Sequence, residues 1–237
     1  MASIPSATTA TSASDWRTKP TDRFVLKWIK IRLSARITPH LAQHQQLRPW
    51  MITVTAAAIG VLAGLVLALG WAFTAGCLAA LAQVLDGVDG QFARLTGTQT
   101  RADAFWDSVL DRYADGALVI GLGIYLIRLP APLPPGVLVG LGALALIGGN
   151  LISYGTARAE TLGLDLGRPT LASKGTRTTV VIVAAWLSLL SPLAPLAALL
   201  YLVIHPNAVV LMRLNRVQRA PGPTPGSPPE PKNHAFG

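Results

Sequence analysis

Six of the eleven acidic residues are aspartates that crowd into one stretch of the chain: Asp86, Asp89, Asp103, Asp107, Asp111 and Asp115. Side chains three or four residues apart lie on the same face of an α-helix. The first two aspartates, and separately the last four, are therefore expected to line one face of two successive, antiparallel helices. Carboxylate oxygens are hard ligands, which favour magnesium, manganese or calcium over zinc. The spacing thus predicts a divalent-metal site between two helices.

Crowded carboxylates repel one another, so each needs a partner. Arg94, Arg101 and Arg112 lie in or beside this stretch, but three cations do not neutralise six anions. A bound divalent metal accounts for the cluster better than arginine pairing alone. Partly hydrated hard metals usually bind substrate phosphates as well, and a pair of such ions stabilises both the entering and the leaving oxygen. The cluster therefore predicts phosphoryl transfer that depends on magnesium or manganese, with room for two ions.

The elements that carry these aspartates are expected to be membrane helices. Hydrophobic residues make up 51% of the 237 residues and charged residues 13%, whereas about a quarter of a soluble domain is charged. The apolar residues form long uncharged stretches at residues 49–69, 71–85, 117–127, 129–157 and 178–212. A membrane-spanning helix needs about 20 residues. The second and third stretches reach that length only if their helices continue into the aspartate region.

These stretches predict six spans within residues 48–213, and hence an all-α integral membrane protein. The second span is expected to run to about Arg94, the third to begin near Asp103 and the fourth to begin near Val137. Two prolines in the segment 191–195 divide the last stretch into a fifth and a sixth span, because proline interrupts helical hydrogen bonding.

Lysine and arginine are distributed unevenly between the two sides of this layout. Eighteen of the 20 lie on one side, Arg112 lies within the third span, and Arg128 alone lies on the other side. The positive-inside rule then places both termini and the aspartate region in the cytoplasm, and we expect a bacterial or archaeal cell membrane. The net charge of +9 does not indicate nucleic acid, since the cations lie at the ends of apolar segments without interleaved aromatic residues. Membrane lipid is their expected partner.

The two ends of the chain are expected to differ from the bundle. Residues 22–47 are predicted to form an amphipathic helix at the membrane surface, in which polar side chains at helical spacing, including Ser34, share one stripe. A basic flank that only sets the topology is the alternative. Residues 1–21 and the proline-rich residues 214–237 are predicted to be disordered.

This arrangement resembles the CDP-alcohol phosphatidyltransferase family, whose signature is DxxDGxxAR, eight residues, then GxxxDxxxD. The residues that match it, at the family's spacing, are Asp86, Asp89, Gly90, Ala93, Arg94, Asp107 and Asp111. The motif covers 26 residues, and the six-span layout with both termini inside agrees over most of the chain. The resemblance also implies a homodimer.

A reaction follows from the resemblance: an acceptor hydroxyl attacks the phosphorus of a CDP-linked donor that is distal to cytidine, and CMP leaves. By the same analogy, four motif aspartates would hold the metal: Asp86, Asp89, Asp107 and Asp111. Asp111 would also be the catalytic base, since a carboxylate near the metal must take the proton of the acceptor hydroxyl as attack proceeds. Gly90, Ala93 and Arg94 would line the CDP pocket, where Arg94 would meet phosphate.

One position departs from the signature. Asp103 stands where the family has its second glycine. An aspartate there is expected to affect the fit of the nucleotide. It would act as a further metal ligand, as a partner of Arg94 or Arg101, or as the mark of a different donor or of reduced activity.

The acceptor is expected to be an alcohol or a phosphorylated polyol. Arg158, Lys174 and Arg177 follow the fourth span on the cytoplasmic side and would bind the phosphate of inositol phosphate or glycerol phosphate. The alternative is that these three cations only set the orientation of the chain in the membrane. The segment DSVLDRYAD is more similar to family members that use phosphorylated inositol acceptors.

Two other classes of membrane protein stay open as alternatives. A cation transporter would use the acids as an ion path, although transporters often show repeated halves and the sequence has no second acidic segment. A prenyltransferase of the UbiA type would need two separate aspartate-rich motifs and more spans than this sequence predicts.

Overall fold

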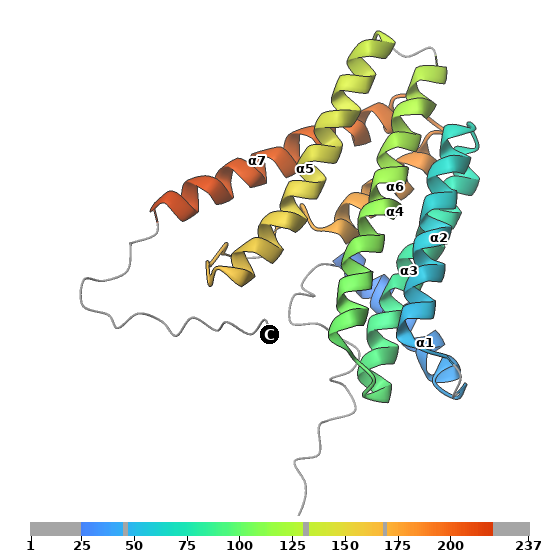
Figure 1. Cartoon of the computed structure of the whole chain (residues 1–237). Coiled ribbons are helices and arrows are strands. Elements are labelled where there is room, and N and C mark those ends of the chain that lie inside the picture. Colours follow the sequence, from blue (N-terminus) through green and yellow to red (C-terminus); the bar gives the residue numbers. More distant parts are fainter. Residues whose placement is uncertain (1–24, 45–46, 130–132, 168–169, 220–237) are drawn as a thin grey trace, which may run out of the picture.

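In the computed structural model, residues 25–44, 47–129, 133–167 and 170–219 are described, and the regular structure in them is helical (Figure 1). The helices in chain order are α1 (Val25–Leu41), α2 (Pro49–Ala68), α3 (Ala72–Thr96), α4 (Arg101–Arg128), α5 (Pro135–Thr161), α6 (Lys174–Leu187) and α7 (Ala194–Arg219). The predicted helices of the bundle are thus confirmed, including the extension of two of them into the aspartate region. The predictions for residues 1–21 and 220–237 lie outside the described residues.

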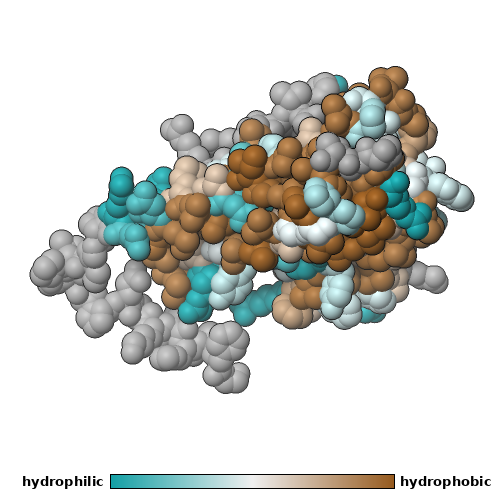
Figure 2. All heavy atoms as spheres, turned by 90° about the horizontal axis from the view of Figure 1, so that it is seen from above, coloured by the Kyte–Doolittle hydropathy of each residue, from teal (hydrophilic) through white to brown (hydrophobic). Residues whose placement is uncertain are grey.

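Four of these helices are long and apolar enough to cross a membrane: α2, α3, α5 and α7. Helix α4 does not meet this criterion because of its charged residues, and α6 does not meet it because it has 14 residues. Seen from above, hydrophobic side chains cover most of the visible surface of the described residues (Figure 2). The chain is therefore an all-α integral membrane protein.

A short turn joins α3 to α4. Helix α3 ends at Gly97, whose φ of 66° lies in the left-handed region that glycine adopts without steric cost. A capping box begins α4: Thr100 Oγ1 accepts a hydrogen bond from the Asp103 N–H at 3.0 Å, and the Asp103 carboxylate accepts one from the Thr100 N–H at 3.1 Å. These two signals reverse the chain within a few residues, so the aspartates of both helices lie at the same end of the bundle.

Helix α2 packs along both α3 and α4, which contact α2 far more than they contact each other. Two glycines allow the approach to α4. A Cβ atom on Gly64 would lie 2.3 Å from Ala117 O, and one on Gly121 would lie 2.2 Å from Gly64 O. Small residues at a helix interface permit this close backbone packing in a membrane. The predicted α3–α4 pair is therefore held in place by α2, and the aspartates face the space between the two helices.

Helix α1 packs against α3, and the contact is polar at its centre. Ser34 Oγ donates to Val84 O at 2.8 Å, and Thr38 Oγ1 donates to the Gln91 side-chain oxygen at 3.0 Å. Ser34 and Thr38 are both fully buried. The predicted helix is present, and Ser34, which was predicted to share a stripe with other polar side chains, is buried against α3, where its hydroxyl donates to a carbonyl.

Helices α5 and α7 pack on each other and slant away from α4 (Figure 1). Helix α7 continues to Arg219, so the predicted start of a disordered tail at residue 214 was too early. The connection from α5 to α6 is tied to this helix, because Arg216 forms an ion pair with Asp165 at 3.2 Å. The Gly167 N–H and then Arg216 lower the pKa of Asp165. The segment between α5 and α6 is thus in contact with α7 at Asp165.

Candidate functional site

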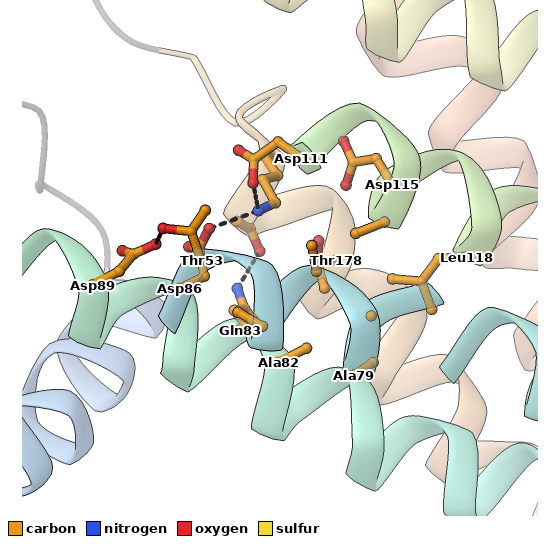
Figure 3. A pocket seen from close by; sticks show the side chains of 16 residues that line it. Thr53, Ala79, Ala82, Gln83, Asp86, Asp89, Asp111, Asp115, Leu118 and Thr178 are labelled. Atoms are coloured by element: carbon orange, nitrogen blue, oxygen red, sulfur yellow. Dashed lines mark hydrogen bonds and ion pairs between the residues drawn. The ribbon is translucent and has the colours of Figure 1, made fainter. Parts of the chain in front are cut away.

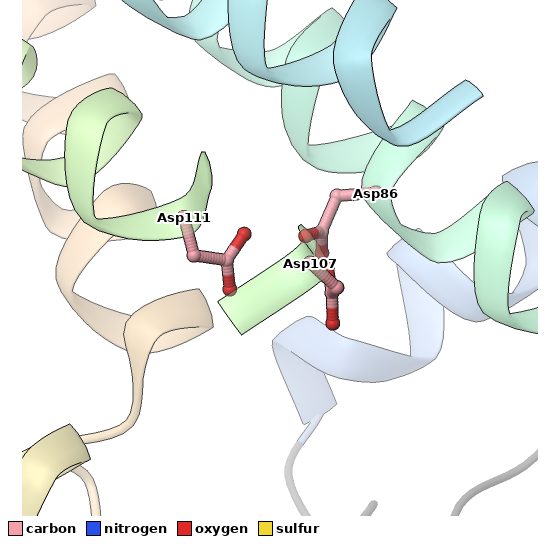
Figure 4. Close-up of side chains that lie close together, drawn as sticks. All are labelled: Asp86, Asp107 and Asp111. Atoms are coloured by element: carbon pink, nitrogen blue, oxygen red, sulfur yellow. The ribbon is translucent and has the colours of Figure 1, made fainter. Parts of the chain in front are cut away.

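Three aspartates from α3 and α4 form a compact group (Figure 4). Asp86, Asp107 and Asp111 each offer a carboxylate oxygen, and these atoms all lie within 4.8 Å of one another. Asp86 comes from α3, and the other two lie one turn apart on α4. Because Asp107 and Asp111 are spaced by four residues, both point to the same side of their helix. The structure therefore brings together three of the four residues predicted to hold metal.

Asp89, the fourth predicted ligand, has other partners. Its side chain accepts a hydrogen bond from Thr53 Oγ1 on α2 at 2.8 Å, and it also accepts one from the Gly90 N–H. Asp89 is buried, with 7% of its surface exposed. It lies outside the group of three but lines the same pocket as Asp86 and Asp111 (Figure 3). Its role as a metal ligand stays a prediction.

Lys174, the first residue of α6, reaches into this group. Its Nζ atom donates to Asp86 Oδ1 at 2.7 Å and also contacts Asp111 Oδ1. The backbone of α6 is held beside α3 because the Gln83 side-chain amide donates to Gly175 O at 2.8 Å. The residue predicted to bind an acceptor phosphate is therefore in contact with two of the carboxylates.

A second buried ion pair lies deeper along the same helices. Arg177 Nη2 contacts Asp115 Oδ2, and Arg177 Nη1 donates to Ala172 O at 2.6 Å. The Arg177 side chain is 6% exposed and the Asp115 side chain 14%. Asp115 lies one turn beyond Asp111 on the face that carries the cluster. The pair therefore neutralises the last aspartate of the series.

Asp103, the residue at the departure from the family signature, does not join the carboxylate group. Its carboxylate accepts hydrogen bonds from the backbone N–H and, at 2.6 Å, from the hydroxyl of Thr100. The structure therefore places Asp103 in the N-terminal cap of α4, a role that the sequence did not predict.

Three arginines from different helices converge on one segment of α5, residues 149–156. Arg112 of α4 contacts Ser153 Oγ, and Arg213 of α7 donates to Thr156 Oγ1 at 3.1 Å. The Nε atom of Arg177 lies 3.3 Å from the point where a Cβ on Gly149 would be. The Nε atom of Arg213 is buried and has no hydrogen-bond partner among the described residues. This arrangement gathers three guanidinium groups beside one segment of α5.

The remaining predicted residues differ in how they relate to this site. Gly90 and Ala93 follow Asp89 on α3, where Ala93 is buried and Gly90 partly so, and Arg94 is partly buried. Arg158 is exposed near the end of α5 and does not line the pocket around the carboxylates. Sequence reasoning used Arg213 only as one of the cations that set the orientation in the membrane. It did place Arg112 inside a span, and a charge at that depth is a signal of function.

The donor set fits a divalent metal. Three carboxylates from two helices provide only oxygen atoms, which magnesium and manganese prefer. The pocket beside them is also lined by small residues of α2 and α3, among them Ala57, Gly60 and Ala79, so a ligand meets little side-chain bulk there. The site can therefore hold a hard divalent ion with a phosphorylated ligand beside it.

Comparison with known proteins identifies the family. Residues 46–214 match the sequence profile described as CDP-alcohol phosphatidyltransferase. The phosphatidylinositol phosphate synthase of Cutibacterium acnes is 26% identical over 84% of this chain and 98% of its own length. The bifunctional IPC transferase and DIPP synthase of Thermococcus kodakarensis is 31% identical over 58% of this chain. The matched part spans 30% of the length of that protein.

Solved structures agree with this. The phosphatidylinositol phosphate synthase PgsA1 of Mycobacterium tuberculosis with CDP-DAG bound superposes with a TM-score of 0.70 and 26% identity, covering 81% of this chain and 96% of that chain. A structure of the same protein in complex with manganese and citrate has a TM-score of 0.69 and covers 80% of this chain and 90% of that chain.

Proposed function

Because the chain belongs to the CDP-alcohol phosphatidyltransferase family, we propose that it transfers a phosphatidyl group from CDP-diacylglycerol to inositol phosphate and releases CMP. The observation that carries this proposal is the group of three carboxylates at the family's motif positions, Asp86, Asp107 and Asp111. A relative with a bound CDP-DAG donor supports the choice of donor. Relatives that are phosphatidylinositol phosphate synthases support the choice of acceptor.

The carboxylate group would hold two magnesium or manganese ions, with Asp89 completing the set. Such ions, when bound, neutralise the diphosphate and stabilise the entering and leaving oxygens. The hydroxyl oxygen of the acceptor attacks the phosphorus distal to cytidine, and Asp111 accepts the proton of that hydroxyl as the attack proceeds. Gly90 and Ala93 border the nucleotide, and Arg94 binds phosphate there.

The arginines that converge on α5 bind the phosphate of the acceptor. Arg112, Arg177 and Arg213 carry fixed positive charges whose planar N–H groups match phosphate oxygens. The partnerless Nε of Arg213 supports this assignment, because a buried donor without an acceptor is costly. Among the cations predicted from the sequence for this role, Arg177 is thus retained. Lys174 contacts two of the carboxylates proposed to hold metal. Arg158 is exposed and does not line the pocket, so it has no part in this proposal.

For the membrane arrangement, the proposal is that α2–α7 all cross the bilayer, with both termini and the carboxylate group on the cytoplasmic side. The full-length packing of α4 along α2 supports a span at α4, and the lysine and arginine distribution supports the orientation. The protein works as a homodimer, as the family resemblance implies.

The test is CMP release by the purified full chain in detergent or lipid with CDP-diacylglycerol and manganese or magnesium. Inositol phosphate, glycerol phosphate and unphosphorylated inositol are compared as acceptors, and CMP is expected with inositol phosphate. Chelation of the metal is expected to stop the reaction. Asp111→Asn is expected to lower the rate by about 10²- to 10⁴-fold, since it removes a general base.

The matched control is Asp103→Asn, which makes the same change on the same helix at a capping carboxylate. It is expected to leave the rate within about twofold, since loss of a cap affects stability, not chemistry. Full activity of Asp111→Asn would contradict the assignment of the base. Flux of a divalent cation through liposomes, without CMP from any acceptor, would favour the transporter instead.

A further inference from the structure

Two features of its position disfavour a positive charge on Lys174, and its contact with the carboxylates offsets them. It is the first residue of α6, and the N-terminus of a helix carries partial positive charge that repels a lysine. Its side chain is 24% exposed, so part of its hydration is lost as well. The ammonium is held there by Asp86 from α3 and Asp111 from α4.

These two carboxylates belong to the group that can hold a metal ion. A carboxylate oxygen that accepts from an ammonium at 2.7 Å has its negative charge directed at that ammonium. A divalent ion bound to the same oxygens would lie a few ångströms from a positive charge, and the two cations would repel strongly where water is largely excluded. Lys174 and a divalent ion at these oxygens would therefore compete for the negative charge of Asp86 and Asp111.

The surroundings allow the side chain of Lys174 to leave while its helix stays. Gln83 fixes the α6 backbone through Gly175 O, so the movement falls on the four rotatable bonds of the lysine side chain. Thr178 lies one turn further along α6 and lines the same pocket. Its hydroxyl oxygen is buried and has no hydrogen-bond partner among the described residues, so it can accept from the released ammonium.

We propose that Lys174 is an exchangeable counter-cation that competes with divalent metal for Asp86 and Asp111 and turns toward Thr178 and the substrate phosphates when metal binds. This inference rests on the proposed function, because it concerns the same carboxylates. The lysine keeps the carboxylates of α3 and α4 together in the metal-free protein. It also couples metal binding to the appearance of a positive charge in the substrate pocket.

The test measures manganese affinity of the full chain in detergent, after metal removal, from the electron paramagnetic resonance signal of free Mn²⁺. Lys174→Met is expected to bind Mn²⁺ about tenfold more tightly than the unaltered protein, since a competing charge is removed. Arg219→Met, which removes an exposed cation at the end of α7, serves as the matched control and is expected to bind Mn²⁺ with unchanged affinity. Equal or weaker binding by Lys174→Met would overturn the proposal.

A measurement on the unaltered protein decides the question if Lys174→Met does not fold. Brief acetylation followed by mass spectrometry reports the reactivity of the Lys174 amine, relative to other lysines of the same sample. Because the amine leaves both carboxylates when metal binds, Mn²⁺ is expected to change the acetylation rate of Lys174 severalfold, and an unchanged rate would overturn the proposal. CMP release by the same sample tests the proposed function separately, so a failed competition with intact CMP release counts against the role of Lys174 alone.

Discussion

The acidic and the basic parts of the site are built in different ways. The acidic part comes from one stretch of 30 residues on α3 and α4, and helical spacing alone aligns its aspartates. The basic part comes from α4, α6 and α7, whose arginines meet on residues 149–156 of α5. Local periodicity therefore produces the carboxylates that we propose to bind metal, whereas packing of distant helices produces the group of arginines that we propose to bind the acceptor phosphate.

Three ion pairs join α6 to the aspartates. Arg177 contacts Asp115, and Lys174 contacts Asp86 and Asp111. Each pair therefore connects α6 to the helices that carry aspartates. Variants that remove one of these ion pairs, or that change only the acidic or only the basic residues, show whether the two groups contribute independently to stability, substrate binding and metal binding.

The largest effect is expected for the link between Asp115 and Arg177. Arg177→Met leaves the Asp115 carboxylate buried without its partner, and breaking a buried pair costs about 3–5 kcal/mol. Thermal unfolding in detergent is expected to shift strongly to lower temperature. The double variant Asp115→Asn with Arg177→Met is expected to recover most of this loss, because no unpaired charge remains. A single variant as stable as the parent would mean that solvent reaches the pair.

An intermediate effect is expected when only the basic part is altered. Arg213→Met removes a charged donor from the proposed acceptor site, and hydrogen bonds to charged groups contribute about 1.5–3 kcal/mol. The KM for inositol phosphate is therefore expected to rise about 10- to 100-fold, while the KM for the CDP-linked donor stays unchanged. Steady-state CMP release measures both. An equal rise in both constants would show that Arg213 supports the whole pocket and not the acceptor site.

The smallest effect is expected at the acidic end of α4. Asp103→Gly restores the glycine of the family signature and removes a capping carboxylate, which costs about 1 kcal/mol of stability. Manganese affinity is expected to stay unchanged, because Asp103 lies outside the carboxylate group. Asp107→Asn, one turn along the helix, is expected to weaken Mn²⁺ binding clearly. Weaker binding by Asp103→Gly would instead make Asp103 a metal ligand.

Much of the fold could be predicted from the sequence, because a membrane helix needs a long stretch of apolar residues that can be recognised directly. The continuation of α3 through Asp86 and Asp89 followed from the short apolar stretch before them, and the structure confirms it. The burial of Ser34 against α3 could not be predicted, because its hydroxyl finds its partner on a helix about 50 residues away. Spacing within one segment carries no information about such a partner.

The alignment of the aspartates along α3 and α4 can be predicted from their spacing, because the 3.6-residue period is a local property of the backbone. The contacts of Lys174 with Asp86 and Asp111, and the meeting of Arg112, Arg177 and Arg213 on α5, arise from the packing of separate helices. Those contacts depend on how closely helices approach, as at Gly64 and Gly121, and on which side chains fill the space between them. Contacts between groups 41 to 88 residues apart follow from that packing.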